Sequence, residues 1–384
     1  MLVLTSGGDR KQRLREIANY DLVLTNYALL RMDIEAWQDI PLFAAILDEA
    51  QTVKNPKAAI SDAVRRLQAT HRLALTGTPI ENRALDLWSI MGFVNPGYLG
   101  TRTDFSRRFD RIDAPAHTRR LLAARLRPML LRRLKTEVAP DLPERIEEQR
   151  MCEMLPAQRK LYLIKLAEAR EEIASIALRG ELKQQQIAIL AILTRLRQIC
   201  CHPQLAGAKW TVGSGKFDAL FDLLEPLLAE GHKVLLFSQF VKALELVQQE
   251  FKRRRIPSHM LTGNDATKDR PGIVRAFEAD PEACVFLISL KAGGTGLNLT
   301  AASYVVLLDP WWNPAVEAQA IDRTHRIGQH RTVIAYRLLM KGTIEERIWE
   351  LQQRKSELVN SVLGDDSFAR KLDKEALEYL FAEG

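Results

Sequence analysis

Seven short runs of this 384-residue sequence contain only aliphatic, aromatic and β-branched residues, with no polar residue alternating between them. A strand with one face in water alternates apolar and polar side chains, so a run that is apolar throughout needs cover on both faces. Helices that connect parallel strands provide that cover. The pattern therefore predicts an α/β protein with parallel sheets, and the predicted strands are residues 22–24, 44–47, 73–75, 234–237, 285–288, 304–308 and 333–336.

The runs form two groups, separated by a long stretch with a different pattern. Between about residues 85 and 206, and most clearly in 161–176 and 182–199, apolar residues recur at helical intervals between charged ones. The chain is also long for a single core. We therefore expect two α/β lobes with a helical insertion between them, and a hinge into the second lobe at residues 209–214.

The overall composition is that of a soluble globular protein, with 47% hydrophobic and 27% charged residues. The longest apolar stretches are far shorter than the roughly 20 residues that span a bilayer. The first ten residues lack the apolar core of a signal peptide. We therefore expect a cytoplasmic, nucleoid-associated protein with no membrane partner.

Net charge says little about the binding partner, and the cysteines indicate neither a disulfide framework nor a zinc site. Lys and Arg outnumber Asp and Glu by 55 to 48, a net charge of +7 that mildly favours an anionic partner such as nucleic acid. The four cysteines are too few and too scattered for a disulfide framework. Cys200, Cys201 and His202 lie together, but no second ligand pair at zinc-like spacing accompanies them. We expect these three to be helix-end and core residues.

Two adjacent carboxylates follow the second predicted strand, in the segment ILDEAQ at residues 46–51. Ligands bind at the C-terminal ends of the strands in parallel α/β sheets. In nucleotide hydrolysis such a carboxylate holds Mg²⁺, usually through water, and we give this role to Asp48. Glu49 could polarise the attacking water as a general base. Two solvated acids in a turn are the alternative.

Two further segments after predicted strands are rich in glycine and small hydroxyl residues. In LTGTPIEN, residues 75–82, Thr76, Gly77 and Thr78 could couple a nucleotide to the rest of the lobe. In SLKAGGTGLNLT, residues 289–300, the glycines let the backbone approach a ligand and present N–H groups to anionic oxygens. Each segment on its own is also an ordinary turn or loop signal.

Two arginines lie three residues apart in QAIDRTHRIGQ, residues 319–329. At helical spacing Arg323 and Arg326 would share one face, so that both could reach one polyphosphate. An arginine finger contributes about 10³ to 10⁵ in the rate of phosphoryl transfer. Ordinary surface arginines are the alternative.

The segment GSGK at residues 213–216 is not a phosphate-binding loop. A Walker A motif needs Gly, four residues, Gly-Lys and then Ser or Thr. Here Trp210 stands in place of the first Gly and Phe217 in place of the hydroxyl residue.

Taken together and in this order, the segments resemble the helicase-like ATPases of superfamily two, the DEAD/DEAH-box group, and specifically the Swi/Snf-type branch. The resemblance covers about residues 21 to 348. Its most specific stretches are residues 46–56, 75–96, 131–143, 235–240, 290–329 and 341–348.

The resemblance implies two RecA-like parallel-sheet lobes, the first incomplete, with a helical insertion between them. It implies a partial first lobe at 1–98, the insertion at 99–208, the second lobe at 209–365 and a C-terminal tail at 366–384. Family members begin the first lobe with an adenine-recognising segment and a phosphate-binding loop, and this sequence starts just short of the strand that follows that loop. We therefore expect a chain truncated before the Walker A motif, with very weak nucleotide binding and negligible hydrolysis by itself.

The resemblance also implies roles for individual residues, with ATP and Mg²⁺ as cofactors. Asp48 and Glu49 match the Mg²⁺-binding and water-activating acids, and Arg323 and Arg326 match arginine fingers that act across the cleft between lobes. The residues implied to couple ATP to movement are Gln51, which stands where relatives commonly have His, and Thr76, Gly77, Thr78, Gly294, Gly296 and Gln319. The residues implied to face the DNA backbone or couple it to ATP are Thr25, Asn26, Tyr27, Ser238, Gln239, Thr295 and Asn298.

The implied function is ATP-dependent translocation along double-stranded DNA with remodelling of protein–DNA complexes. Its partners would be duplex DNA and DNA-bound proteins such as polymerase or nucleoid proteins. A non-enzymatic module that grips DNA or a partner protein through Arg132, Arg133, Lys135 and residues 252–255 is the alternative, and its phosphate contacts would weaken with salt. An RNA helicase of the DEAD-box type is disfavoured, because those end the sixth motif in Gly-Arg, where this chain has Gly328 and Gln329.

Overall fold

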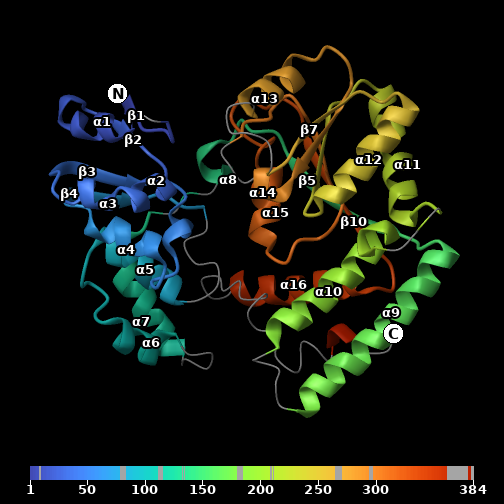
Figure 1. The fold of residues 1–384 in the computed structure, drawn as a ribbon, viewed down its shortest axis with the longest axis horizontal. Coiled ribbons are helices and arrows are strands. Elements are labelled where there is room, and N and C mark those ends of the chain that lie inside the picture. Colours follow the sequence, from blue (N-terminus) through green and yellow to red (C-terminus); the bar gives the residue numbers. More distant parts are fainter. Residues whose placement is uncertain are drawn as a thin grey trace. The chain divides into compact units, whose positions relative to one another are not determined.

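The computed structural model describes residues 1–7, 10–77, 84–110, 116–131, 133, 135–179, 185–207, 210, 212–263, 270–293, 297–360 and 379–381. The chain divides into two compact units (Figure 1), the first comprising Met1–Arg132 with Ser356–Ser367 and the second Arg133–Lys355 with Phe368–Gly384. None of the described helices is long and apolar enough to cross a bilayer.

The first unit contains two small parallel sheets, β1–β2 and β3–β4. Its strands are β1 (Leu2–Val3), β2 (Val23–Leu24), β3 (Leu42–Leu47) and β4 (Ala69–Ala74). Its helices are α1 (Arg10–Arg15), η1 (Ile17–Asn19), α2 (Tyr27–Met32), α3 (Ile34–Trp37), η2 (Ala50–Val53), α4 (Ala59–Arg66), α5 (Ala84–Val94), α6 (Arg102–Phe109), α7 (Ala116–Leu126) and η3 (Arg127–Met129).

The two faces of the β3–β4 sheet differ in burial. Ala45 and Leu47 of β3 point into a core that also contains Val53, Val64 and other apolar side chains of α2, α4 and α5. Ile46 of β3 is 59% exposed and its register partner Leu73 of β4 is 50% exposed, so the described residues leave these apolar side chains of the opposite face uncovered. The prediction that both faces are covered is therefore met on one face only.

The second unit is built on one six-stranded parallel sheet, in the order β5-β10-β9-β6-β8-β7. Its strands are β5 (Arg145–Cys152), β6 (Val234–Ser238), β7 (Ser258–Leu261), β8 (Val285–Ser289), β9 (Tyr304–Leu307) and β10 (Val333–Met340). Its helices are α8 (Lys135–Val138), α9 (Pro156–Leu178), α10 (Gln186–Cys201), η4 (Pro203–Ala206), α11 (Gly215–Ala229), α12 (Val241–Arg254), α13 (Arg270–Ala279), α14 (Leu290–Gly293), α15 (Pro314–Ile321) and α16 (Ile344–Asn360).

Both faces of this larger sheet are covered, which explains its apolar strands. Along β6, Val234 and Leu236 belong to one core cluster, and Leu235 and Phe237 belong to another. Side chains of α9 to α12 and α16 fill the first cluster, and side chains of α13, α14 and α15 contribute to the second. Because successive strand residues point to opposite faces, each face needs its own apolar set. The predicted α/β fold with parallel strands is confirmed.

The stretch 85–206, predicted to be almost entirely helical, also contains a strand that was not predicted. Residues Arg145–Cys152, of sequence RIEEQRMC, form the edge strand β5, which pairs with β10 over its whole length. Only Cys152 of this strand is buried. Charged side chains on an edge strand remove the apolar run that marks a central strand and oppose pairing with other chains. Helices α9 and α10 follow it, close to the predicted bounds.

The boundary between the compact units falls at residue 132, inside the segment 99–208 that is predicted as an insertion. Helices α6 and α7 of that segment belong to the first unit, and α9 and α10 to the second. The segment 209–214, predicted as a hinge, has the second unit on both sides of it. The functional domain limits remain a prediction.

Candidate active site

The acidic pair of the first unit sits where β3 ends. The Leu75 amide donates to the Leu47 carbonyl at 2.7 Å, and the Ala50 amide donates to the Leu75 carbonyl at 2.9 Å, so the ends of β3 and β4 are joined. Asp48, between them, is exposed, and Glu49 is partly buried. This is the strand end at which ligands bind in parallel sheets.

Glu49 has a left-handed backbone, with φ 48° and ψ 52°. For a residue with a Cβ this conformation costs roughly 1–2 kcal/mol. Its amide donates to the Asp48 carboxylate at 2.9 Å, which helps to hold the turn. Strained backbone of this kind concentrates at functional positions.

A hydrogen-bonded relay joins Glu49 to the end of β4. Gln51 Nε2 donates to Glu49 Oε2 at 2.6 Å, and Thr76 Oγ1 donates to Gln51 Oε1 at 2.7 Å. Both groups of the Gln51 amide are therefore used. The structure brings together these three predicted residues, although Gln51 and Thr76 are 25 residues apart in the sequence. Gly77 is exposed beside them, and Thr78 lies outside the described residues.

Tyr27, predicted to face DNA, contacts the acidic segment. Its hydroxyl donates to the Asp48 carbonyl at 2.7 Å. Burial, followed by the charges of Asp48 and Glu49, raises the pKa of Tyr27 to about 12, so the phenol stays a donor. Asn26 caps helix α2, since its side chain accepts from the Leu29 amide at 2.9 Å. Thr25 is exposed.

The helical spacing expected for the two arginines is wrong. Helix α15 ends at Ile321, and both arginines lie in the turns that follow. Arg323 is only 1% exposed, and its carbonyl accepts from the Leu299 amide at 2.9 Å. Arg326 is partly exposed and its Nε donates to the Asp322 carbonyl at 3.1 Å. Arg326 is therefore the more accessible of the two.

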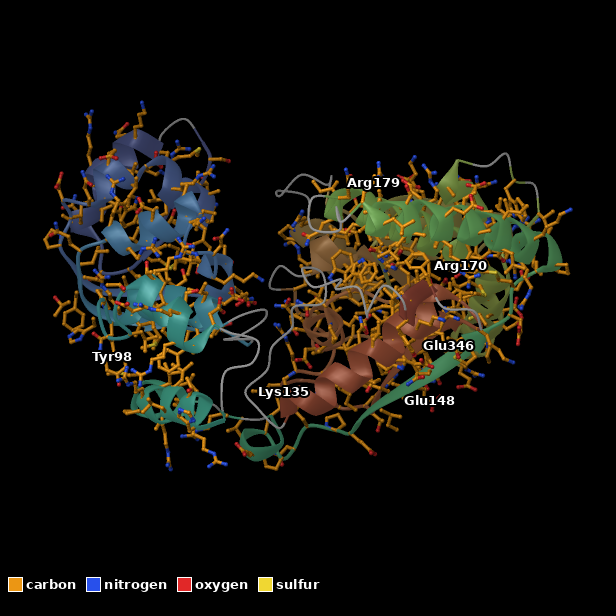
Figure 2. All side chains as sticks on the ribbon, turned by 90° about the horizontal axis from the view of Figure 1, so that it is seen from below. Tyr98, Lys135, Glu148, Arg170, Arg179 and Glu346 are labelled. Atoms are coloured by element: carbon orange, nitrogen blue, oxygen red, sulfur yellow. The ribbon has the colours of Figure 1, made fainter. Side chains whose placement is uncertain are left out.

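Ion pairs and hydrogen bonds that the sequence analysis did not predict hold this arginine segment in place. Lys135 (Figure 2) places its Nζ 2.8 Å from Asp322 Oδ1 and donates to the His325 carbonyl at 3.0 Å. Arg145 Nη1 lies 3.0 Å from the same Asp322 oxygen, and His325 Nε2 lies 2.8 Å from the Pro143 carbonyl. The family-specific stretch 131–143 could have indicated this role. Lys135, considered above as a phosphate contact, is engaged here instead.

Ser238 and Gln239 lie at the end of β6 beside a buried carboxylate. Ser238 is fully buried and its hydroxyl donates to Asp309. The backbone nitrogen of Gln239 lies 3.3 Å from both carboxylate oxygens of Asp309. A direct contact between the Ser238 side chain and DNA is therefore ruled out in this conformation, whereas a coupling role through Asp309 is compatible with it.

Arg197 of α10 completes this network, a role that the sequence pattern does not predict. Its guanidinium is fully buried, donates to Gln239 Oε1 at 3.1 Å and to the Pro310 carbonyl, and lies 4.9 Å from the centre of the Trp312 ring. Nη2 lies 3.8 Å from Asp309 Oδ2. Burial raises the pKa of Asp309 and lowers that of Arg197, and the opposite charge of each partner counteracts the effect. The helix predicted as an insertion thus supports the strand ends of the second unit.

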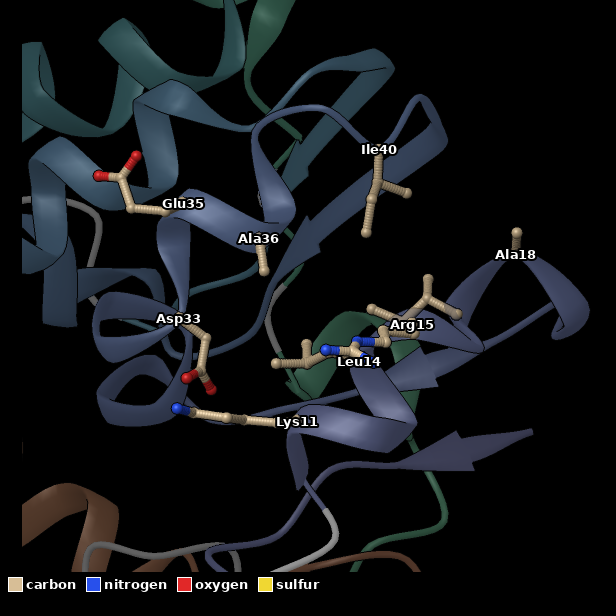
Figure 3. A pocket seen from close by; sticks show the side chains of 9 residues that line it. Lys11, Leu14, Arg15, Ala18, Asp33, Glu35, Ala36 and Ile40 are labelled. Atoms are coloured by element: carbon tan, nitrogen blue, oxygen red, sulfur yellow. The ribbon is translucent and has the colours of Figure 1, made fainter.

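The remaining predicted residues are dispersed. Gln319 is partly exposed on α15, and Asn298 is exposed. Gly294, Thr295 and Gly296 lie outside the described residues. A surface depression of about 480 Å³ in the first unit contains none of the predicted site residues (Figure 3). Its lining residues are Lys11, Leu14, Arg15, Ile17, Ala18, Asp33, Glu35, Ala36 and Ile40.

The structure confirms that GSGK is not a phosphate loop. Lys216 is fully buried, and its ammonium pairs with Glu345 and lies 3.3 Å from the Leu338 carbonyl. At Gly215 an added Cβ would lie 1.8 Å from the Glu153 carbonyl oxygen, so this glycine serves close packing.

The neighbouring residues Cys200, Cys201 and His202 are also structural, as expected. Cys200 and Cys201 are fully buried in the core. His202 caps η4 through Nδ1, which accepts from the Gln204 amide at 3.3 Å, and burial lowers its pKa to about 4.

Comparison with known proteins identifies the family. Residues 2–205 match the SNF2-related domain and residues 215–328 match the helicase conserved C-terminal domain. An uncharacterised ATP-dependent helicase of Mycoplasma genitalium is 36% identical over 99% of this chain and 36% of its own length. The TATA-binding protein-associated factor BTAF1 of Arabidopsis thaliana is 32% identical over 98% of this chain and 22% of its own length. The chain thus spans about a third or less of these curated relatives.

A solved structure agrees with this assignment. The Sulfolobus solfataricus SWI2/SNF2 ATPase core in complex with double-stranded DNA is 34% identical, with a TM-score of 0.52. The match covers 100% of this chain and 81% of that one. The chain therefore belongs to the SNF2-related family, the Swi/Snf-type branch of the superfamily-two helicase-like ATPases.

Proposed function

We propose that this chain supplies part of an ATP-driven motor that moves along double-stranded DNA. The observation that carries the proposal is the relay Thr76–Gln51–Glu49 beside Asp48, at a strand end of an SNF2-related domain. The relay links the acid that would act on water to the end of a second strand. Hydrolysis at the acid would then be sensitive to movement of the neighbouring strand end.

The acids would act in sequence on ATP and water. Asp48, which is exposed, would hold Mg²⁺ through water, and the ion would neutralise charge on the β- and γ-phosphates. Glu49 would accept a proton from the attacking water. Gln51 donates to Glu49 and so fixes the carboxylate, a positioning role supported by the 2.6 Å contact.

The second unit would contribute positive charge to the transition state. Arg326 is the better placed of the two candidate fingers because it is partly exposed. Arg323 would have to leave its buried position to reach a phosphate, so its side chain would act only after a local rearrangement. A site assembled from two units makes the rate depend on their closure.

Duplex DNA would stimulate hydrolysis by favouring the closed state. We propose that Thr25, Asn298 and Gln239 lie along the DNA path, and that Arg197 keeps Gln239 in position through its 3.1 Å hydrogen bond. The solved structure of a similar ATPase core in complex with double-stranded DNA supports this partner. The similarity to a TATA-binding protein-associated factor supports action on DNA-bound proteins. We propose polymerase or nucleoid proteins as such partners.

The test measures ATP turnover by the full-length gene product with and without duplex DNA. We expect DNA to raise the rate, Glu49→Gln to abolish it, and Arg326→Ala to lower it by about 10³-fold or more. Glu35→Gln and Arg331→Ala, at exposed positions of the first and second units, are matched controls. Unchanged turnover in Glu49→Gln or Arg326→Ala would reject the roles proposed here.

The same experiment separates a motor from a binding module. Salt-dependent DNA binding without any ATP hydrolysis would favour the module. For the 384 residues alone we predict negligible hydrolysis, because the sequence contains no Walker A motif.

A further inference from the structure

Three side chains of the second unit, none of them in the proposed motor site, converge in one place. They are His259 of β7, Asp280 just after α13 and Cys284 just before β8. The atoms that each could offer to a metal ion all lie within 4.8 Å of one another. Within the residues that the structure describes, no other group of three His, Cys, Asp or Glu side chains does so.

The cluster lies at strands β7 and β8, at the opposite end of the strand order from β5, beside which the arginine segment is held. Ser238 ends β6 and Asp309 follows β9, so both belong to the C-terminal ends of the strands. His259 is the second residue of β7 and Cys284 precedes β8, so both belong to the N-terminal ends. Since all six strands are parallel, their N-terminal ends lie on one side of the sheet and their C-terminal ends on the opposite side. The cluster is therefore apart from Ser238 and Asp309, and the arginine segment, which an ion pair joins to β5, lies at the other edge of the sheet.

The ligand atoms are held in place by the surrounding structure. His259 Nε2 lies 3.0 Å from Asp280 Oδ2, and its ring packs edge-on against Phe277 and Phe286. The other oxygen, Asp280 Oδ1, accepts from the Glu282 amide at 3.1 Å. Fixed orientation of the ligating groups is what metal sites usually require from their surroundings.

The burial of the three groups suits an ion reached from one side. Cys284 is fully buried, whereas the side chains of His259 and Asp280 are 24% and 21% exposed. The hydrogen bond from His259 lowers the pKa of Asp280, and burial raises the pKa of Cys284 to about 11. Without an ion the cluster therefore holds a neutral thiol beside a carboxylate. A bound cation would convert that thiol to a thiolate and release its proton to solvent.

We propose that His259, Asp280 and Cys284 bind a zinc-class divalent cation, with water as the fourth ligand. One nitrogen, one carboxylate oxygen and one sulfur are typical ligands of Zn²⁺, whereas Mg²⁺ and Ca²⁺ prefer oxygen alone. At Zn–N and Zn–O distances of about 2.0–2.2 Å and Zn–S of about 2.3 Å, these tetrahedral ligands would stand roughly 3.3–3.6 Å apart. The present spacing needs shifts of about an ångström or less to reach this arrangement.

The ion would fasten the edge of the sheet. β7 is an edge strand and pairs only with β8 among the described strands. A metal joining His259 to Cys284 and Asp280 would tie that strand to the start of β8 and the end of α13. Binding to the folded state alone at 100 times Kd raises the folding equilibrium constant about 100-fold.

The experiment titrates the metal-free 384-residue chain with Zn²⁺ in competition with a chromophoric chelator. We expect one equivalent to bind, and Cys284→Ser and His259→Gln to lose it. Cys152→Ser changes another buried cysteine, and His232→Gln changes another histidine that lies beside a carboxylate, at 3.3 Å from Glu230. These two controls should bind as the original chain does. Absence of the equivalent, or its retention in Cys284→Ser, would overturn the proposal.

Co²⁺ binding to the original chain provides a second measurement, which does not depend on whether the variants fold. The original chain should show a thiolate-to-cobalt charge-transfer band and a higher unfolding temperature in the presence of the ion. A chain that binds no Co²⁺ through sulfur and unfolds at the same temperature with and without Zn²⁺ contains only a His–Asp hydrogen bond beside a buried thiol. That result rejects the metal site and leaves the proposed motor function untouched.

Discussion

Replacing Arg197 by Met should destabilise the second unit far more than its position on a predicted insertion helix suggests. Met keeps much of the apolar stem but removes the guanidinium that donates to Gln239 and Pro310 and faces Asp309. Breaking a buried ion pair by removing one partner costs about 3–5 kcal/mol, because the remaining charge stays buried. We expect a loss of this size in the free energy of unfolding.

The pH dependence of that loss follows from the pKa of Asp309. Burial already raises it above the unfolded-state value. The folded state therefore binds the proton more tightly, and stability falls as pH rises from the unfolded pKa to the folded one. Without Arg197 the pKa of Asp309 rises further. The penalty should thus be smaller at about pH 5 than at about pH 8.

Amide hydrogen exchange, read on peptides that contain β6 and β9, measures this effect within the second unit. A loss of about 3–5 kcal/mol makes exchange roughly 10²- to nearly 10⁴-fold faster where global opening limits it. Arg195→Met, on the exposed side of the same helix, is the matched control and should change stability by about 0.5 kcal/mol or less. In the Asp309→Asn background, Arg197→Met should cost at least about 1 kcal/mol less. A cost no larger than that of the control, or full additivity, would refute the reasoning.

Three further predictions concern stability and can be measured by chemical denaturation. Lys216→Met should cost about 3–5 kcal/mol, because Glu345 would remain buried without its partner, and a simultaneous Glu345→Leu change should recover much of the loss. Gly215→Ala should cost more than about 2 kcal/mol, because its Cβ would lie 1.8 Å from the Glu153 carbonyl oxygen; a cost below that of Gly213→Ala, where the nearest atom is 3.9 Å away, would contradict this. Glu49→Gly should be about 1 kcal/mol more stable than Glu49→Ala, because glycine adopts the left-handed backbone without strain; equal stabilities would show that the turn relaxes.

The sequence predicts central strands well and edge strands poorly. β6, β8, β9 and β10 are apolar because helices cover both faces, and that pattern is visible in the sequence alone. β5, with RIEEQRMC, is an edge strand exposed along most of its length, and no apolar run marks it. Its place in the sheet depends on β10, which follows much later in the chain.

The candidate site is predictable where chemistry depends on residue type and not where it depends on burial. Two adjacent acids after an apolar strand are recognisable, and so is the poor match of GSGK to a phosphate loop. The sequence does not predict that α15 ends before the two arginines. The Thr324 hydroxyl donates to the Ile321 carbonyl at 2.8 Å, and this side-chain-to-backbone bond replaces a further helical turn. Arg197 looks like any helix arginine until the fold surrounds it.

The pairing of β5 with β10 affects how the protein is made. Roughly 190 residues separate the two strands, and at 5–20 residues per second a ribosome needs about 10–40 s to add them. During that time the first strand of the larger sheet has emerged without its neighbour. Its acidic and basic side chains, which give the strand no apolar run, would then discourage it from pairing with other nascent chains. The charged residues that make β5 hard to predict therefore also protect the strand whose pairing partner is synthesised last.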